Sequence, residues 1–444
     1  MILTTLFAVA SAEAQVPESR TPLTLERAFE IAAENNPAYR SARASLETVP
    51  ALERPVWRAF LPLPGSLTLG TNYNQRRSFT AIDEFGRPVR VEDPVIVTSS
   101  GSSQGLAWGA ITLFDGGSRL AAARSDRARA DGIRASVDAT AVRLRSALAR
   151  LYLDALRAEQ EIEIQERMLV AAGEILESTE RLYAAGLRDP LDLMSAELRV
   201  AQREQVLGRA RGTLSTARLA LGHEMGLGAA VGEALADGFP EAFDPAGLNV
   251  ERLVARAAAG SPELARLSAS VERAGHGVSV ARGQRWPSVS MGLNSSRAVS
   301  SRGSDGLFQL NPLDQSYGVS LSIRLPLFDQ AGLSTRVAEA RVARVVAEED
   351  LRAGQLTVER EVRGGVIALQ NAWREIANAE RLAELSARRL ELATRRYLLG
   401  DISYADFAMA SEDAFAQEIG ALTARYIFAV ALLGLETAVG GPVR

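Results

Sequence analysis

A short turn between two helical segments occurs twice in this sequence, and this duplication is the strongest constraint on the fold. Glycine readily adopts the left-handed backbone conformation that ends many helices. Pro190 in one copy and Ser403 in the other suit the first positions of a following helix. Each copy therefore predicts a sharp helix–turn–helix tip. The residues that repeat at one constant offset are Tyr183, Gly186 and Asp192 in the first copy, and Tyr397, Gly400 and Asp406 in the second.

The segment before each turn carries an apolar residue at every seventh position. A sustained seven-residue repeat is typical of helices that supercoil along an apolar seam. One amphipathic helix in an ordinary bundle is the alternative, although helices in globular proteins average only about 11–12 residues. We therefore predict two long helical hairpins, 118–221 and 334–434. The repeating residues are Ala141, Leu148, Ala155, Ile162, Leu169 and Leu176 in the first hairpin, and Val362, Leu369, Ile376, Ala383 and Leu390 in the second.

The composition excludes several classes of function. Hydrophobic residues make up 47%, charged residues make up 23%, and the net charge is −4, which fits neither a disordered chain nor a nucleic-acid-binding protein. Cysteine is absent, and the two histidines, His223 and His276, belong to no cluster with metal-ligand spacing. We therefore predict no catalytic residue, no metal site and no cofactor, and we do not expect an enzyme.

The first 14 residues are interpreted as a signal peptide. An apolar start leads into Ala12-Glu13-Ala14, which has the Ala-x-Ala cleavage pattern. A positively charged start is missing and the apolar run is short, so the true N-terminal start is left open. No apolar run reaches the about 18 residues that a membrane helix needs, and the best candidate, 426–435, is interpreted as a buried helix segment.

Two regions, about 66–115 and 288–328, change from helical to alternating periodicity. Each predicts a pair of strands joined by a polar loop, as in a hairpin of a membrane β-barrel. A soluble hairpin has the same periodicity and is the alternative. In a membrane we expect one set of alternating side chains to face lipid and the other to face the lumen. The lipid-facing set is Leu321, Ile323 and Leu325, and the lumen-facing set is Ser320, Ser322 and Arg324.

The chain divides into two structural repeats, 15–225 and 249–444, with a linker or equatorial region at 226–248. Each repeat contains helices, one strand pair and one long hairpin. Four strands per chain cannot close a barrel, and an open sheet edge would leave backbone groups unpaired in lipid. Two chains would give eight strands around an interior filled by side chains, whereas three would give twelve strands with an opening. The smallest assembly with a pore is therefore a homotrimer.

An ordered set of motifs spans nearly the whole chain after the signal peptide. This set resembles the TolC-type outer-membrane efflux proteins. The resemblance implies a mainly α-helical fold with membrane β-strands, in which three chains form a periplasmic α-helical tunnel and a shared twelve-stranded barrel in the outer membrane of a Gram-negative bacterium. The motifs are Leu23-Thr-Leu-Glu-Arg-Ala28, Asn35-Asn36-Pro37, Leu113-Phe-Asp-Gly-Gly117, Leu327-Phe-Asp329 and the two tips.

The same resemblance implies the outer-membrane exit duct of a tripartite efflux pump that exports small molecules such as drugs. Its implied partners are a periplasmic adaptor protein, an inner-membrane transporter and outer-membrane lipid, with no nucleic acid. The duct of a type I protein secretion system is an alternative. A periplasmic coiled-coil adaptor or scaffold is an alternative of another class, but it would favour a single hairpin between soluble β domains.

The resemblance also places the periplasmic gate at the two tips. Asp406 matches an aspartate at the constriction of some family members, whereas Met409 and Ile402 stand where those members have a second aspartate and a basic residue. Asp192 and Asp406 could instead only cap the helices that they begin. The predicted gate residues are Asp406, Asp192, Tyr397, Tyr183 and Arg188, and the tip turns predicted to dock a partner contain Gly186, Leu187, Gly400, Asp401 and Ser403.

Overall fold

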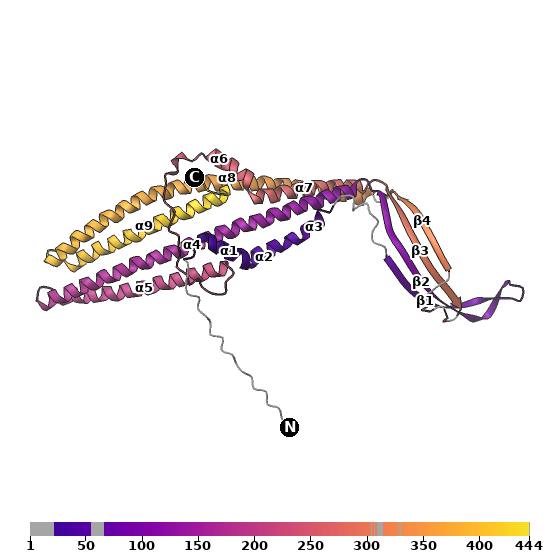
Figure 1. The fold of residues 1–444 in the computed structure, drawn as a ribbon, viewed down its shortest axis with the longest axis horizontal. Helices are drawn as coiled ribbons and strands as arrows, with labels where there is room; N and C mark the ends of the chain where they lie inside the picture. The colour runs from indigo at the N-terminus through magenta and orange to yellow at the C-terminus, as the bar shows by residue number, and fades with distance from the viewer. Residues whose placement is uncertain are drawn as a thin grey trace, which may run out of the picture. The chain divides into compact units, whose positions relative to one another are not determined.

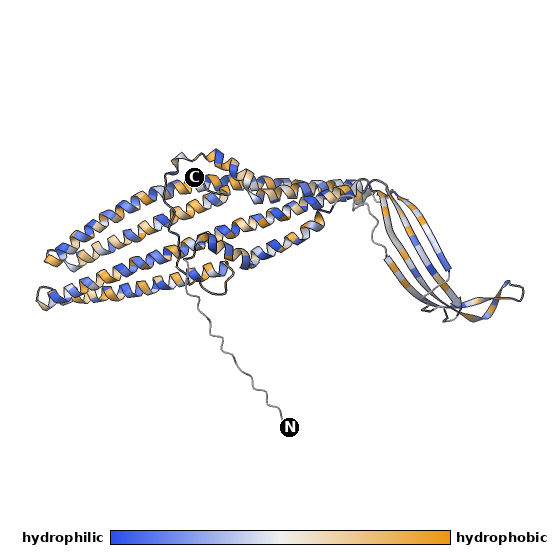
Figure 2. Cartoon of the chain, in the orientation of Figure 1, coloured by the Kyte–Doolittle hydropathy of each residue, from blue (hydrophilic) through white to orange (hydrophobic). Residues whose placement is uncertain are grey.

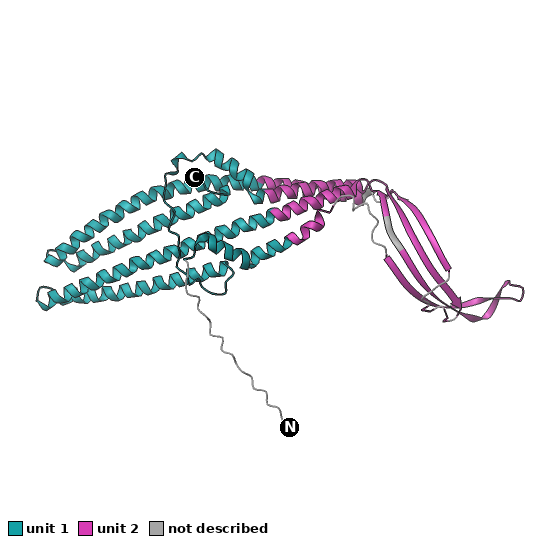
Figure 3. Ribbon diagram, viewed as in Figure 1, with its two compact units in different colours: residues 1–45, 135–264, 353–444 teal, residues 46–134, 265–352 magenta. Residues whose placement is uncertain are grey.

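The computed structural model describes residues 22–54, 66–302, 304–305, 307–308, 314–327 and 330–443. The predicted signal peptide and Phe328-Asp329 lie outside these residues. The chain forms two compact units, and each takes segments from both halves of the sequence (Figure 3). Unit 1 comprises 1–45, 135–264 and 353–444, and unit 2 comprises 46–134 and 265–352. Each predicted repeat therefore contributes to both units.

Two long helical hairpins dominate the fold, as the heptad repeat predicts (Figure 1). Helix α4 (Ser118–Ala184) turns back into α5 (Pro190–Glu224), and α8 (Gln330–Leu399) turns back into α9 (Tyr404–Val439). Hydrophobic and hydrophilic residues are interleaved along all four helices (Figure 2). This pattern leaves each helix an apolar stripe to bury and a polar face for solvent.

Shorter helices precede each strand pair. Asn36 separates two of them because its side chain accepts a hydrogen bond of 3.0 Å from the Tyr39 amide, and Pro37 fills the first helical position behind it. The shorter elements are α1 (Leu25–Asn35), α2 (Pro37–Ala44), the 3-10 turn η1 (Ser45–Thr48), α3 (Val49–Leu52), the 3-10 turn η3 (Pro245–Gly247), α6 (Val250–Gly260) and α7 (Pro262–Gly283).

The core of unit 1 follows the heptad positions. Leu148 of α4 is fully buried among residues of α1 and α5, and Leu369 of α8 is fully buried among residues of α6 and α9. Phe428 and Leu435 of α9 are buried in the same cluster as Leu369. Both hairpins bury part of the predicted seam, and the remaining seam residues are half-buried, so the prediction of two long packed hairpins is confirmed.

Helix α9 departs from one expectation. Among the residues that the structure describes, it is the one helix long and apolar enough to cross a membrane by length and composition, whereas the apolar runs of the sequence predicted no such segment. A third of its most apolar window is buried inside the chain. Phe428, Leu432 and Leu435 of this helix belong to the core of unit 1, so packing accounts for part of its apolar composition.

Tyr152 fastens the linker to the helical core. Its hydroxyl donates to the Leu23 carbonyl at 2.8 Å and accepts from the Asp237 amide at 3.0 Å, beside a parallel bridge between Leu23 and Leu235. Burial raises the pKa of Tyr152 from 10.0 to about 12. The proton therefore stays on the hydroxyl at neutral pH, and its contribution to stability is complete below pH 10 and lost as the pH rises through the folded pKa.

The strands form one antiparallel sheet in the order β1-β2-β3-β4. The strands are β1 (Ser66–Ile82), β2 (Pro88–Phe114), β3 (Ser288–Arg302) and β4 (Asp314–Arg324). Strands β1 and β4 lie at the two ends of this order, so each has one edge that is unpaired in the sheet of a single chain. The predicted strand pairs are therefore present, and they join into a single four-stranded sheet.

The two faces of the sheet differ in character. Paired residues of antiparallel strands lie on the same face, so the register assigns each pair to one side. The predicted alternation of β4 is confirmed, although Leu325 falls one residue beyond the end of the strand. On the apolar face, Ile323 of β4 is 69% exposed in the single chain, whereas its partner Val289 of β3 is half-buried. One face carries the pairs Val289–Ile323, Met291–Leu321 and Leu293–Val319, and the other carries Ser288–Arg324, Ser290–Ser322 and Gly292–Ser320.

Candidate functional site at the helical tips

The two tips end in the same backbone turn. Gly186 and Gly400 have φ angles of 73° and 84°, which is the left-handed region that favours glycine. In the first tip the Leu187 amide donates to the Leu182 carbonyl at 2.9 Å, and the Asp401 amide makes the equivalent bond in the second. This pattern is the Schellman motif, which satisfies the last carbonyls of a helix. The duplication in the sequence is therefore a duplication of structure.

Different residues cap the helices that follow the tips. The Asp189 carboxylate accepts from the Leu191 amide at 2.8 Å and caps α5, and the Ser403 hydroxyl accepts from the Asp406 amide at 3.1 Å and caps α9. The idea that Asp192 and Asp406 cap these helices is therefore wrong. Both occupy the third helical position, because the extended backbone that defines a cap lies three residues earlier.

Arg188 joins the tip of the first hairpin to that of the second. Its guanidinium donates to the Ile402 carbonyl at 3.3 Å and also to the Tyr397 carbonyl. The same group lies 4.2 Å from the centre of the Tyr397 ring and forms an ion pair with Asp192 at 3.6 Å. Its side chain is only 10% exposed. A cation at the C-terminal end of α8 also complements the dipole of that helix.

Tyr397 is the centre of an aromatic core at the second tip. The side chain is fully buried, its hydroxyl lies 2.8 Å from the Thr179 hydroxyl, and its ring stacks on Phe407 with the centroids 5.2 Å apart. Tyr404 meets the same ring edge-on at 5.8 Å. Burial raises the pKa of Tyr397, while the Thr179 hydrogen bond and the Arg188 charge oppose the rise. We call Thr179, Arg188, Asp192, Tyr397, Tyr404 and Phe407 the tip cluster.

The structure brings together only some of the predicted gate residues. Arg188, Asp192 and Tyr397 lie in the tip cluster. Tyr183 is 41% exposed, and Asp406 is exposed while its carboxylate accepts a 2.7 Å hydrogen bond from the Ser403 hydroxyl. The residues predicted to dock a partner are all exposed: Gly186, Leu187, Gly400, Asp401 and Ser403.

Sequence reasoning missed several residues that connect the two hairpins. Arg199 and Arg203 of α5 both pair with the same oxygen of Glu412 in α9. Farther from the tips, the Tyr426 hydroxyl of α9 donates to Asp154 of α4 at 2.5 Å. Arg199 and Arg203 are four residues apart, so they lie on one face of α5 and can share a partner. Nothing in the sequence identified Glu412 as that partner. The two hairpins are thus held by polar contacts along α9 as well as at the tips.

The family model for outer membrane efflux proteins matches residues 28–227 and 253–441, which together make up most of the chain. The chain belongs to this family. It is 26% identical over 365 residues to protein CyaE of Bordetella pertussis, across 82% of this chain and 71% of that protein. The outer membrane efflux fold also recurs in solved structures that are less similar in sequence.

Two solved structures illustrate this likeness. The outer membrane protein VceC of Vibrio cholerae has a TM-score of 0.74 at 19% identity, covering 95% of this chain and 97% of that one. The MtrE outer membrane channel of Neisseria gonorrhoeae, in its open state, has a TM-score of 0.73 at 20% identity, covering 95% and 89%. At these identities the likeness shows the fold.

Membership of the outer membrane efflux family confirms the resemblance and the mainly α-helical fold with membrane β-strands that it implied. It places the chain in the outer membrane of a Gram-negative bacterium, with the helical part extending into the periplasm. The family consists of channels rather than enzymes.

Proposed function

We propose that this outer membrane efflux protein is the exit duct of a tripartite pump that exports small molecules such as drugs, and that its tips form the gate. The observation that carries the proposal is the Arg188 contact, in which one buried guanidinium holds the ends of both hairpins together. Such a contact can stabilise a closed tip and be released when a periplasmic adaptor and an inner-membrane transporter engage the exposed turns.

Deletion of the gene from its host would test the cargo. Loss of the duct is expected to raise the intracellular accumulation of small fluorescent substrates, and restoring the gene is expected to reverse it. The secreted protein profile is expected to stay unchanged. Normal accumulation together with the loss of one secreted protein would contradict drug export and support the type I secretion duct.

The open edges of the sheet support assembly from three chains. In lipid, unpaired backbone groups at the edges of β1 and β4 would each cost several kcal/mol, so the edges must pair with other chains. Because neighbouring strands alternate in direction, β4 of one chain can pair antiparallel with β1 of the next. We expect native mass spectrometry in mild detergent to show a homotrimer. A monodisperse monomer that stays soluble without detergent would refute this closure.

The exposed apolar face of the sheet is the surface we assign to lipid. Replacing Ile323 by arginine should cost roughly 2–4 kcal/mol if the residue lies near the bilayer midplane, measured by reversible unfolding from lipid vesicles. Water-soluble thiol reagents should label cysteines placed at Ser320 and Ser322 faster than cysteines at Leu321 and Ile323. The opposite labelling pattern would show that the faces are assigned the wrong way round.

Asp406 is the residue we assign to an acidic ring. Threefold symmetry would repeat this exposed carboxylate around the axis of the tunnel, where it would favour cations. Asp406→Asn is therefore expected to lower cation selectivity in planar bilayers while the fold stays intact. Asp413→Asn is the matched control, because it removes an exposed charge from the same helix farther from the tip. Unchanged selectivity and conductance in Asp406→Asn would rule out the ring.

A further inference from the structure

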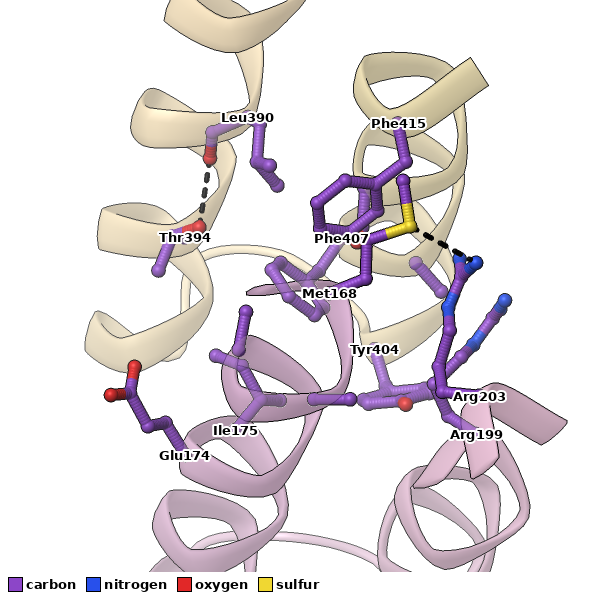
Figure 4. A pocket seen from close by; sticks show the side chains of 14 residues that line it. Met168, Glu174, Ile175, Arg199, Arg203, Leu390, Thr394, Tyr404, Phe407 and Phe415 are labelled. Atoms are coloured by element: carbon purple, nitrogen blue, oxygen red, sulfur yellow. Dashed lines mark hydrogen bonds between the residues drawn. The ribbon is translucent and has the colours of Figure 1, made fainter. Parts of the chain in front are cut away.

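A small cavity lies between the two hairpins, immediately beside the tip cluster. Its volume is about 110 Å³, and residues of α4, α5, α8 and α9 all contribute to its walls. Phe407 and Phe415 of α9 and Ile175 of α4 give it an apolar wall (Figure 4). Any molecule held in this cavity would therefore contact both hairpins at the same time.

One end of the cavity is cationic. Arg203 is only 9% exposed, and Arg199 lies beside it in the lining. The two guanidiniums share one oxygen of Glu412, so one positive charge in this group is not balanced by that carboxylate. Glu174 and Thr394 lie on the other side of the cavity, away from the arginines (Figure 4).

One N–H group of the Arg203 guanidinium donates to a weak hydrogen-bond acceptor. Its Nη1 atom points at the sulfur of Met168 at 3.6 Å (Figure 4). A thioether sulfur is a weak hydrogen-bond acceptor, so an anionic oxygen at this position would make a stronger bond to the same N–H. The buried guanidinium is thus prepared for a better acceptor that enters the cavity.

We propose that this cavity binds a small aromatic carboxylate and that the bound molecule holds the two hairpins together. The carboxylate is placed on Arg203 and Arg199, and the ring is placed between Phe407, Phe415 and Ile175. A ligand that touches both hairpins binds the closed arrangement better than one in which they separate, so it shifts the population toward the closed tip. The gating part rests on the proposed duct function, whereas the binding part does not.

The size of the cavity favours a compact ligand. A water molecule occupies ~30 Å³ in the liquid, so the volume of the cavity corresponds to a few water molecules. For comparison, a dry cavity of about 150 Å³ is known to accept benzene. This cavity is smaller than that, so a single ring with one carboxylate is at the upper limit of size, and we place the edge of its ring at the mouth of the cavity. Larger drug-like molecules do not fit without separating the hairpins.

Binding can be measured directly on the intact protein in detergent. The probe is 4-fluorobenzoate, followed by the transverse relaxation of its fluorine signal. We expect saturable binding that benzoate displaces, whereas benzyl alcohol, which lacks the charge, and acetate, which lacks the ring, displace it poorly. Equal displacement by benzyl alcohol would overturn the assignment of an anion, and a lack of saturable binding would overturn the site.

Two variants locate the binding. Arg203→Met removes the charge and leaves Arg199 to pair with Glu412, so affinity should fall roughly tenfold or more, as expected for a hydrogen bond to a charged group. Arg211→Met, on the exposed side of the same helix, is the matched control and should bind normally. Ala172→Leu adds bulk to the cavity wall and should also abolish binding. Normal affinity in Arg203→Met would refute the site even if Ala172→Leu fails to fold.

Channel recording separates the two parts of the proposal. Benzoate added on the side of the tips should lower the open probability of the native channel and leave the open probability of Arg203→Met unchanged. Saturable binding with no effect on opening would overturn the gating part. The absence of any conductance from the native protein would instead count against the duct function, while the binding result would still stand.

Discussion

Replacing Arg188 by leucine should raise the open-to-closed ratio of the channel roughly 10- to 150-fold. The change removes two hydrogen bonds from a buried guanidinium to the Tyr397 and Ile402 carbonyls, together with the ion pair to Asp192. Hydrogen bonds to charged groups contribute about 1.5–3 kcal/mol, and a coupling of this size corresponds to that change in population. Open probability in planar bilayers is the measurement.

Two further variants test whether Arg188 acts by its geometry. Arg188→Lys keeps the charge but lacks the planar group that spans two carbonyls and stacks on an aromatic ring, so it should fall between the native protein and the leucine variant. Arg181→Leu is the control, because Arg181 is exposed and pairs with Glu177 within its own helix. If Arg188→Leu and Arg181→Leu have the same open probability, the tips are held by other contacts.

Replacing Tyr397 by alanine should destabilise the second tip by about 3–5 kcal/mol, which is the usual cost of truncating a buried aromatic side chain. The substitution would remove the stacking partner of Phe407 and the hydrogen bond to Thr179, and it would leave a void in their place. Amide hydrogen exchange at the end of α8 and the start of α9 is the appropriate measurement, because the loss is local. Tyr397→Phe should lose only about 0.5–1.5 kcal/mol, since it keeps the ring.

The duplication supplies a matched control for this variant. Tyr183 occupies the equivalent position in the first tip but is 41% exposed. Tyr183→Ala should therefore change exchange at its own tip far less than Tyr397→Ala does at the second. Equal losses of protection would mean that burial in the tip cluster does not decide the stability of the tips.

Local signals explain why so much of the fold was predictable. The heptad residues predicted α4 and α8, glycine predicted both turns, and strict alternation predicted the faces of β4, because each depends on neighbours within one element. Asp192 and Asp406 were placed in the first turn correctly, but the alternative that they cap these helices is wrong, and their role at the gate stays a prediction. Asp189 and Ser403 were equally suitable caps, and only the backbone conformation decides between such candidates.

The contacts between hairpins were not predictable from one sequence. Tyr183 and Tyr397 have the same local context, yet only Tyr397 is buried. Tyr397 is covered by Arg188 and by the rings of Tyr404 and Phe407, whereas the counterpart of Arg188 in the repeat, Ile402, carries no charge that could make the same contact to Tyr183. Periodicity describes which face of a helix is buried but carries no information about a partner that is distant along the chain.

The unpaired edges of β1 and β4 also affect how the protein reaches its membrane. A lone chain that entered the bilayer would expose two rows of unpaired backbone groups, whereas three chains that enter together expose none. If three chains close one barrel, as we propose, insertion is coupled to the meeting of several chains, and its rate should rise more steeply than linearly with their concentration. Chains that have not yet met remain aggregation-prone intermediates, because open edges pair with any strand that they encounter.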